Sequence, residues 1–218
     1  MPEADGIRTA RVVRLGVLVS GRGSNLQAIL DAIADHRLSA TVTVVVSDRE
    51  KALALDRAQA SGIPTIVLSP KAFPTREAFD VQLVNVLRDS GVDAVVLAGY
   101  MRIITPTLLR AFPHRVINIH PSLLPAFPGL NAQRQALEHG VKVAGCTVHF
   151  VDEQVDNGAI ILQASVPVLE DDTEDTLSQR ILEQEHRLLP QALQLYAEGR
   201  LTIHGRRVSI APNTHVMR

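Results

Sequence analysis

Short apolar runs rich in β-branched residues alternate with longer amphipathic segments through the first half of the chain. This pattern predicts strands at 14–20, 41–47, 64–69, 92–99 and 115–120. It predicts helices from Ser24, from about Glu50, over 75–90 and over 106–112. Continuously apolar strands are typical of sheets buried on both faces, and strand–helix alternation requires right-handed crossovers. We therefore predict an α/β fold with a doubly wound, mostly parallel central sheet and helices on both faces.

The second half of the chain opens with a proline-rich stretch, PSLLPAFPGL, at 121–130. Prolines at this density exclude helix and central strand, so an irregular loop is predicted. Two strands, at 143–151 and 159–168, and a helix over 174–198 should follow. No repeat or linker divides the chain, so we predict a flexible tail over 1–14 and a single domain over 15–218.

Composition narrows the class of protein. The 218 residues carry a formal net charge of -1, which provides no basic field for nucleic acid. The single cysteine, Cys146, excludes an internal disulfide and a cysteine-rich metal cluster. No apolar run is long enough to span a bilayer, and the first fourteen residues lack the apolar core of a secretory signal. We expect a cytoplasmic protein that acts on small molecules, without a nucleic-acid or membrane partner.

The first predicted strand runs directly into GRGSN, which opens the first helix. Gly21 and Gly23 should form the turn, and Ser24 is a natural N-cap. Exposed amides at a helix N-terminus bind phosphate, and the side chains of Ser24 and Asn25 can add hydrogen bonds. The spacing matches neither the dinucleotide fingerprint nor the Walker loop, because Leu26 stands three after Gly23 and no GK[ST] follows. A plain glycine turn into a capped helix is the alternative.

Asn118 and His120 lie two residues apart at the end of a predicted strand, so their side chains share one face. An amide can stabilise a developing oxyanion, and an imidazole can exchange protons near neutral pH. This pair suits acyl transfer. A buried structural histidine that donates to a backbone carbonyl is the alternative.

An acidic turn, DEQVDNG, separates the last two predicted strands. Asp152, Glu153 and Asp156 could belong to a solvated hairpin. A carboxylate from the turn could instead approach His120 and raise the pKa of its imidazole. Metal binding is a third reading, but the acidic residues lack the spacing of a known calcium loop.

Four segments together resemble a known family: GRGSNLQAIL, AGYMRIITP, NIHPSLLPAFPGL and HFVDEQVDNGAIILQ. They are similar to the phosphoribosylglycinamide formyltransferases of purine synthesis, over residues 15 to about 200. The resemblance implies that glycinamide ribonucleotide receives the formyl group of 10-formyltetrahydrofolate, with no metal and no ATP. It also implies a phosphate-binding N-terminal half, a folate-binding C-terminal half, and a monomer or homodimer.

The resemblance also assigns roles to individual residues. The catalytic trio would be Asn118, His120 and Asp156. The substrate would be bound by Gly23, Ser24, Asn25 and Glu185. The folate would be bound by Arg76, Met101, Arg102, Ile103, Ile104, Asn118, Asp152 and Asp156. Glu185 has independent support, because it falls on the apolar stripe of the last helix formed by Leu177, Ile181, Leu188, Ala192 and Leu195. An ion pair with an arginine is the structural alternative for this glutamate.

The sequence departs from the family after PGL, where Asn131 and Gln133 stand in place of histidines. A proton-handling role for that segment is therefore in doubt. The rival enzymes are methionyl-tRNA formyltransferase and formyltetrahydrofolate hydrolase, which usually need a further domain. A catalytically silent phosphosugar-binding module on the same fold is the rival outside enzymes.

Overall fold

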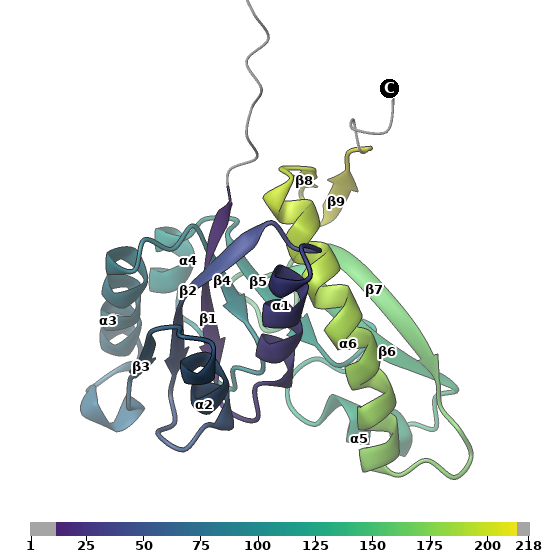
Figure 1. The fold of residues 1–218 in the computed structure, drawn as a ribbon. Coiled ribbons are helices and arrows are strands. Elements are labelled where there is room, and N and C mark those ends of the chain that lie inside the picture. The colour runs from purple at the N-terminus through teal and green to yellow at the C-terminus, as the bar shows by residue number, and fades with distance from the viewer. Residues whose placement is uncertain (1–11, 213–218) are drawn as a thin grey trace, which may run out of the picture.

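The structure is a computed structural model that describes residues 12–212, with a nine-stranded sheet at its centre (Figure 1). The strands are β1 (Val13–Val19), β2 (Ala40–Ser47), β3 (Thr65–Val67), β4 (Ala94–Leu97), β5 (Val116–His120), β6 (Val143–Phe150), β7 (Ile160–Pro167), β8 (Leu201–His204) and β9 (Arg207–Ile210). The helices are α1 (Ser24–Ala34), α2 (Leu53–Ala60), the 3-10 turn η1 (Pro70–Ala72), α3 (Arg76–Asp89), α4 (Pro106–Ala111), α5 (Ala132–Glu138) and α6 (Glu174–Ala197).

The sheet has a parallel half and a largely antiparallel half. Its strand order is β3-β2-β1-β4-β5-β6-β7-β9-β8. Strands β1 to β5 pair in parallel, whereas β6 pairs antiparallel with both β5 and β7. The chain order reverses beside β1, so the loops after β1 and β4 leave the sheet at a topological switch point, where open α/β sheets bind ligands. The predicted α/β class with a mostly parallel sheet is confirmed.

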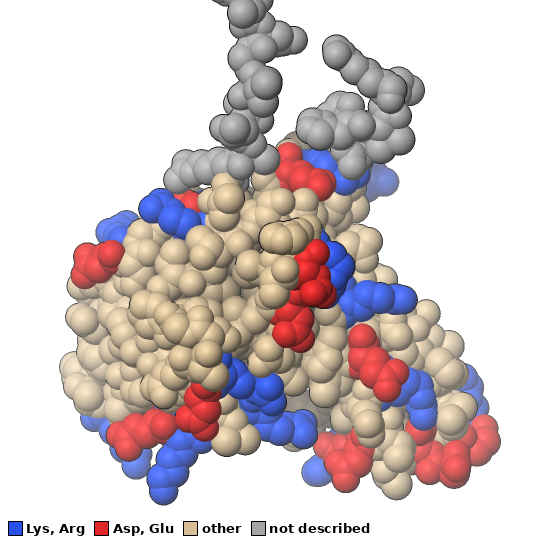
Figure 2. All heavy atoms as spheres, in the orientation of Figure 1, with Lys and Arg blue, Asp and Glu red and all other residues tan. Residues whose placement is uncertain are grey.

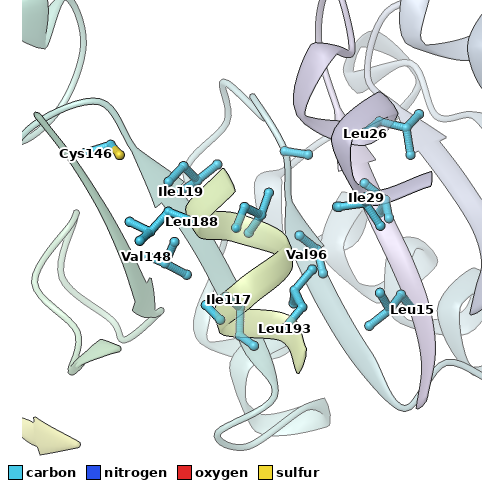
Figure 3. Close-up of a cluster of buried hydrophobic side chains, with 14 of the residues drawn as sticks. Leu15, Leu26, Ile29, Val96, Ile117, Ile119, Cys146, Val148, Leu188 and Leu193 are labelled. Carbon is cyan, nitrogen blue, oxygen red and sulfur yellow. The ribbon is translucent and has the colours of Figure 1, made fainter. Parts of the chain in front are cut away.

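Two apolar cores lie on opposite faces of the sheet. On one face α1, α2, α5 and α6 pack against the strands, and on the other α3 and α4 do so. Figure 3 shows the first core, in which Leu188 and Leu193 of α6 lie against Ile117, Ile119 and Val148 of the sheet. Removing each large aliphatic side chain of this kind from water contributes about 1.5–3 kcal/mol.

At β5 and β6 one face of the sheet carries apolar side chains and the other carries polar ones. Ile117, Ile119 and Val148 are directed into the core beneath α6. The side chains that alternate with them, Asn118 and His120 on β5 and His149 on β6, therefore point to the opposite face. Loop residues Phe127 and Asp156 contact His120 and Asn118 there, so the fold brings polar groups and loops together.

Several boundaries differ from the sequence prediction. Helix α2 begins at Leu53 rather than near Glu50, because the hydroxyl of Ser47 holds residue 49 in a turn. Strand β1 begins at Val13, inside the predicted tail, and residues 1–11 lie outside the described part of the chain. No prediction was made for α5 or for the β8–β9 hairpin, which the structure adds.

The face of the molecule drawn in Figure 2 carries no single large charged field. Figure 2 shows acidic and basic side chains scattered over this face among uncharged residues. Among residues 12–212, the helices include none with the length and apolar character that crossing a bilayer demands.

Candidate active site

Asp156 joins the two polar side chains of β5. It lies in the turn between β6 and β7 with a φ of 49°, in the left-handed region. Its Oδ2 lies 3.3 Å from His120 Nδ1, and its Oδ1 accepts a hydrogen bond of 3.4 Å from Asn118 Nδ2. The N–H of Gly129 donates to Oδ2 at 2.8 Å. The structure thus brings together the three residues predicted as a catalytic trio, from two separate segments.

His149 belongs to the same cluster, although sequence reasoning did not single it out. It stands opposite Asn118 in the antiparallel β5–β6 pairing. Its Nε2 lies 3.1 Å from Asn118 Nδ2 and 3.7 Å from Asp156 Oδ1, and its Nδ1 lies 2.8 Å from the carbonyl oxygen of Phe150. If Asn118 Nδ2 donates to Nε2, the proton of the neutral ring sits on Nδ1 and is donated to Phe150.

Both ring nitrogens of His120 face oxygen acceptors. Nδ1 faces Asp156, and Nε2 lies 2.9 Å from the carbonyl oxygen of Phe127. Only a doubly protonated ring could donate to both oxygens at once. Burial opposes that charge: His120 is 5% exposed, and desolvation lowers its pKa below the usual 6.5 despite the pull of Asp156. The carboxylate raises this pKa as expected, but desolvation outweighs the attraction and the net shift is downward.

Asp156 itself is held as a carboxylate. Burial alone would raise its pKa, but the contact with His149, the charge of His120 and the Gly129 N–H together lower the pKa below its usual value. The site therefore contains a fixed negative charge beside a histidine that burial tends to keep neutral, so both groups favour their deprotonated forms.

A cavity of about 500 Å³ opens over this cluster. Asn118, His120, His149 and Asp156 line it on one side. Its lining also includes most of the residues assigned to the folate, namely Met101, Arg102, Ile103, Ile104 and Asp152. Arg76 is exposed at the start of α3 and does not line this cavity.

The cavity wall at 101–104 is fixed at both ends by buried polar groups. The hydroxyl of Ser20 accepts from the N–H of Met101 at 2.9 Å, and the carboxylate of Asp80 accepts from the N–H of Thr105 at 2.6 Å. Between these ends, Met101 and Ile103 are 55% and 58% exposed. An apolar edge held this rigidly suits a flat, largely apolar ligand.

Hydrogen bonds within the acidic turn hold its conformation. Asp152 accepts hydrogen bonds from the N–H of Gln154 at 2.9 Å and from Asn157 Nδ2 at 3.1 Å. At Gly158 a side chain would collide with the carbonyl oxygen of Phe150, so the turn requires glycine there. Within residues 12–212, no three His, Cys, Asp or Glu side chains are grouped to hold a metal ion.

The glycine loop ends β1 and begins α1. Gly23, not Ser24, is the N-cap, with a φ of 74°, and Ser24 is the first residue of the helix. The prediction that Ser24 caps the helix is therefore wrong, because Gly23 takes the left-handed turn that positions the helix start. No side chain of the described residues caps α1, so its first N–H groups remain free to bind an anion.

Glu185 of α6 lies against this loop. Its Oε2 accepts a hydrogen bond of 2.7 Å from Asn25 Nδ2, so the partner of Glu185 is an amide rather than an arginine. Glu185 is 7% exposed, and burial raises the pKa of its carboxyl group although the amide opposes the shift. Asn25 Oδ1 is buried and has no hydrogen-bond partner among the described residues. This pair leaves buried acceptor capacity beside the loop.

Gly23→Ala should destabilise the protein by about 1–3 kcal/mol, because alanine is strained at positive φ. Its Cβ would also lie 2.6 Å from Ala54 Cα in α2. Gly21→Ala is the matched control, since a Cβ there meets nothing within 4 Å. Thermal unfolding of both variants checks the expectation. Equal stability of the two variants would contradict it.

The similarity of this chain to known proteins covers the site residues described above. The family model described as Formyl transferase matches residues 13–193. The chain belongs to the formyl transferase family. The match begins with β1 and its glycine loop, and it extends through Glu185 in α6.

Several relatives within the formyl transferase family are close. The phosphoribosylglycinamide formyltransferase of Escherichia coli K12 is 46% identical over 188 residues, which is 86% of this chain and 89% of that protein. The trifunctional purine biosynthetic protein adenosine-3 of Drosophila pseudoobscura is 50% identical over 214 residues, or 95% of this chain, which spans only 15% of that protein. The crystal structure of glycinamide ribonucleotide transformylase 1 from Symbiobacterium toebii has a TM-score of 0.93 at 57% identity, covering 96% of this chain and 99% of that one.

Proposed function

We propose that this enzyme transfers the formyl group of 10-formyltetrahydrofolate to the amine of glycinamide ribonucleotide, a step of de novo purine biosynthesis in the cytosol. The observation that carries the proposal is the convergence of Asn118, His120 and Asp156 at the wall of a cavity, in a member of the formyl transferase family. Relatives named phosphoribosylglycinamide formyltransferase are 46% identical over 86% of the chain and 43% identical over 83% of it, which supports the same substrates.

The glycine loop would bind the phosphate of the acceptor. Free N–H groups of Gly23, Ser24 and Asn25 at the start of α1 would bind its oxygens, and the helix dipole favours the negative charge. Glu185 and Asn25 would accept hydrogen bonds from the ribose hydroxyls. Hydroxyl groups are suited to this position because the buried pair offers acceptor oxygens, of which Asn25 Oδ1 has no hydrogen-bond partner among the described residues.

The spacing of the strands fits one acceptor molecule. In the sheet β4 separates β1 from β5, so the glycine loop and the trio leave the sheet two strand spacings apart, roughly 10 Å. The acceptor has about nine bonds between its phosphorus and its amine nitrogen, a reach of roughly 10 Å when extended, as for three residues of backbone. An acceptor bound by its phosphate would therefore place its amine near His120.

The reaction needs one carbon–nitrogen bond to form and another to break. The neutral amine attacks the formyl carbon, and the tetrahedral intermediate then releases N10 of the folate. One proton leaves the amine and one is added to N10, and we assign their exchange to His120. Asn118 would donate to the developing oxyanion. Its 3.4 Å contact with Asp156 is long, so a substrate oxyanion would readily replace that partner.

Asp156 would fix the orientation of His120 and stabilise the imidazolium whenever the ring takes up a proton. The folate would occupy the cavity, with its ring system against the edge formed by 101–104 and near Asp152 and Arg102. A role for Arg76 would be confined to a part of the folate outside this cavity. We propose that neither a metal ion nor ATP takes part.

A direct assay tests the function. The purified enzyme should convert glycinamide ribonucleotide and 10-formyltetrahydrofolate to formylated product and tetrahydrofolate in equal amounts, with and without EDTA. Tetrahydrofolate that appears equally fast without the acceptor would instead indicate a hydrolase. Binding of both ligands without turnover would indicate a silent binding module.

A further inference from the structure

Arg57 reaches from the last turn of α2 back to the glycine loop. The side chain is half-buried. Its Nε donates a hydrogen bond of 3.0 Å to the carbonyl oxygen of Arg22, which stands in the middle of the loop. Its Nη1 donates a bond of 3.2 Å to Gln27 Oε1, in the first turn of α1. One guanidinium group therefore connects the loop with the helix that follows it.

The position of this guanidinium is fixed from both sides. Gln27 is itself oriented by a hydrogen bond of 2.8 Å from its Nε2 to Asp31 Oδ1, one turn along α1. The start of α2 holds the loop a second time, because the N–H of Ala54 donates to the carbonyl oxygen of Gly21 at 3.1 Å. Helix α2 thus holds the carbonyls of Gly21 and Arg22, the two residues that precede the N-cap.

The charge of Arg57 has no carboxylate within ion-pair distance among the described residues. Asp31 is linked to it only through the neutral amide of Gln27. The pKa of His186 in α6 is lowered by burial and by the charge of Arg57, although the charge of Asp31 opposes the shift. Figure 2 shows basic side chains with acidic ones beside them on the surface below α1 and α2. A cation without an ion-pair partner among the described residues, beside a loop of free N–H groups, favours an anionic ligand.

We propose that Arg57 is a positioning residue that makes the glycine loop selective for a phosphorylated acceptor. It does so by holding the Arg22 carbonyl, and thus the direction of the following N–H groups, and by contributing positive charge behind them. It is not expected to touch the reacting atoms or the folate. The inference rests on the proposed function, because it names the residue that supports binding of the phosphate in that reaction.

The test is the effect of Arg57→Gln on each substrate separately. The variant should raise KM for glycinamide ribonucleotide about tenfold, the effect of losing a hydrogen bond from a charged group. It should raise the inhibition constant of inorganic phosphate, used as a competitor of the acceptor, by a similar factor. Both kcat and KM for 10-formyltetrahydrofolate should stay within about twofold, which a general loss of structure would not allow. Arg88→Met, which removes an exposed cation from the last turn of α3, should change neither constant.

Arg57→Lys separates positioning from charge, and it also serves if Arg57→Gln fails to fold. An ammonium group keeps the charge but cannot reproduce the fixed fork that holds Arg22 and Gln27. If both variants fold, the KM of Arg57→Lys for the acceptor should lie between the values of the wild type and Arg57→Gln. If only Arg57→Lys folds, its KM should exceed the wild-type value several-fold. If the wild-type enzyme forms product and either folded variant has the wild-type KM for the acceptor, the inference is overturned. A wild-type enzyme that forms no product overturns the proposed function instead.

Discussion

An Asp156→Asn enzyme should lose about 10²–10⁴-fold in kcat, the range in which a positioned general acid or base contributes. The carboxylate lies 3.3 Å from His120 Nδ1 and receives the N–H of Gly129 at 2.8 Å. Asparagine keeps the shape but removes the charge that counteracts desolvation of the imidazole. The pKa of His120 should then fall further below 6.5, because Asp156 is the largest influence that raises it.

Two measurements separate this effect from simple unfolding. Thermal unfolding shows whether the variant is folded, and the profile of kcat against pH reports the titration of the site. The limb of the profile that belongs to His120 should move to lower pH in Asp156→Asn. Asp89→Asn, a neutralised carboxylate on the exposed end of α3, should leave both rate and profile unchanged. A folded Asp156→Asn enzyme with wild-type kcat would show that the carboxylate has no part in the reaction.

The parallel half of the fold was predictable because each element there carries its own local signal. Runs such as VTVVVS in β2 are apolar on both faces, and the amphipathic helices between them have clear starts. Helix α5 has no such signal, since it spans only Ala132–Glu138 and follows a left-handed Asn131. The β8–β9 hairpin was also missed, although its alternating residues around Gly205 could have been recognised.

Within the site, the sequence predicted which residues share a face of one strand. It did not predict which residues the pairing of two strands makes neighbours. Asn118 and His120 were found because two residues of spacing fix a common face. His149 was missed because its position depends on the antiparallel register that sets it opposite Asn118. That register cannot be derived from the composition of either strand. The net direction of the His120 pKa shift could not be predicted for a similar reason, since burial of the ring by the loop at Phe127 is a tertiary property.

Asn118→Ala should reduce kcat by about 10²–10³-fold, which is roughly 2.7–4 kcal/mol of transition-state stabilisation, as for other oxyanion donors. The amide lines the cavity, and Asp156 and His149 hold it by contacts of 3.4 and 3.1 Å. A group held in this way needs little reorganisation when charge develops. The loss should therefore appear mainly in kcat, with a smaller change in KM for either substrate.

Asn118→Ala also removes contacts that stabilise the site, so it needs controls for folding. Without the amide, His149 Nε2 and Asp156 Oδ1 both lose a partner, so thermal unfolding must establish that the variant is folded. Asn85→Ala on the exposed face of α3 is the matched control, and it should behave as the wild type. A folded Asn118→Ala enzyme within threefold of wild-type kcat would exclude the amide as the oxyanion donor. The developing charge would then have to be stabilised by His120, and if the protonated imidazole does this, the rate of that variant should rise as the pH falls.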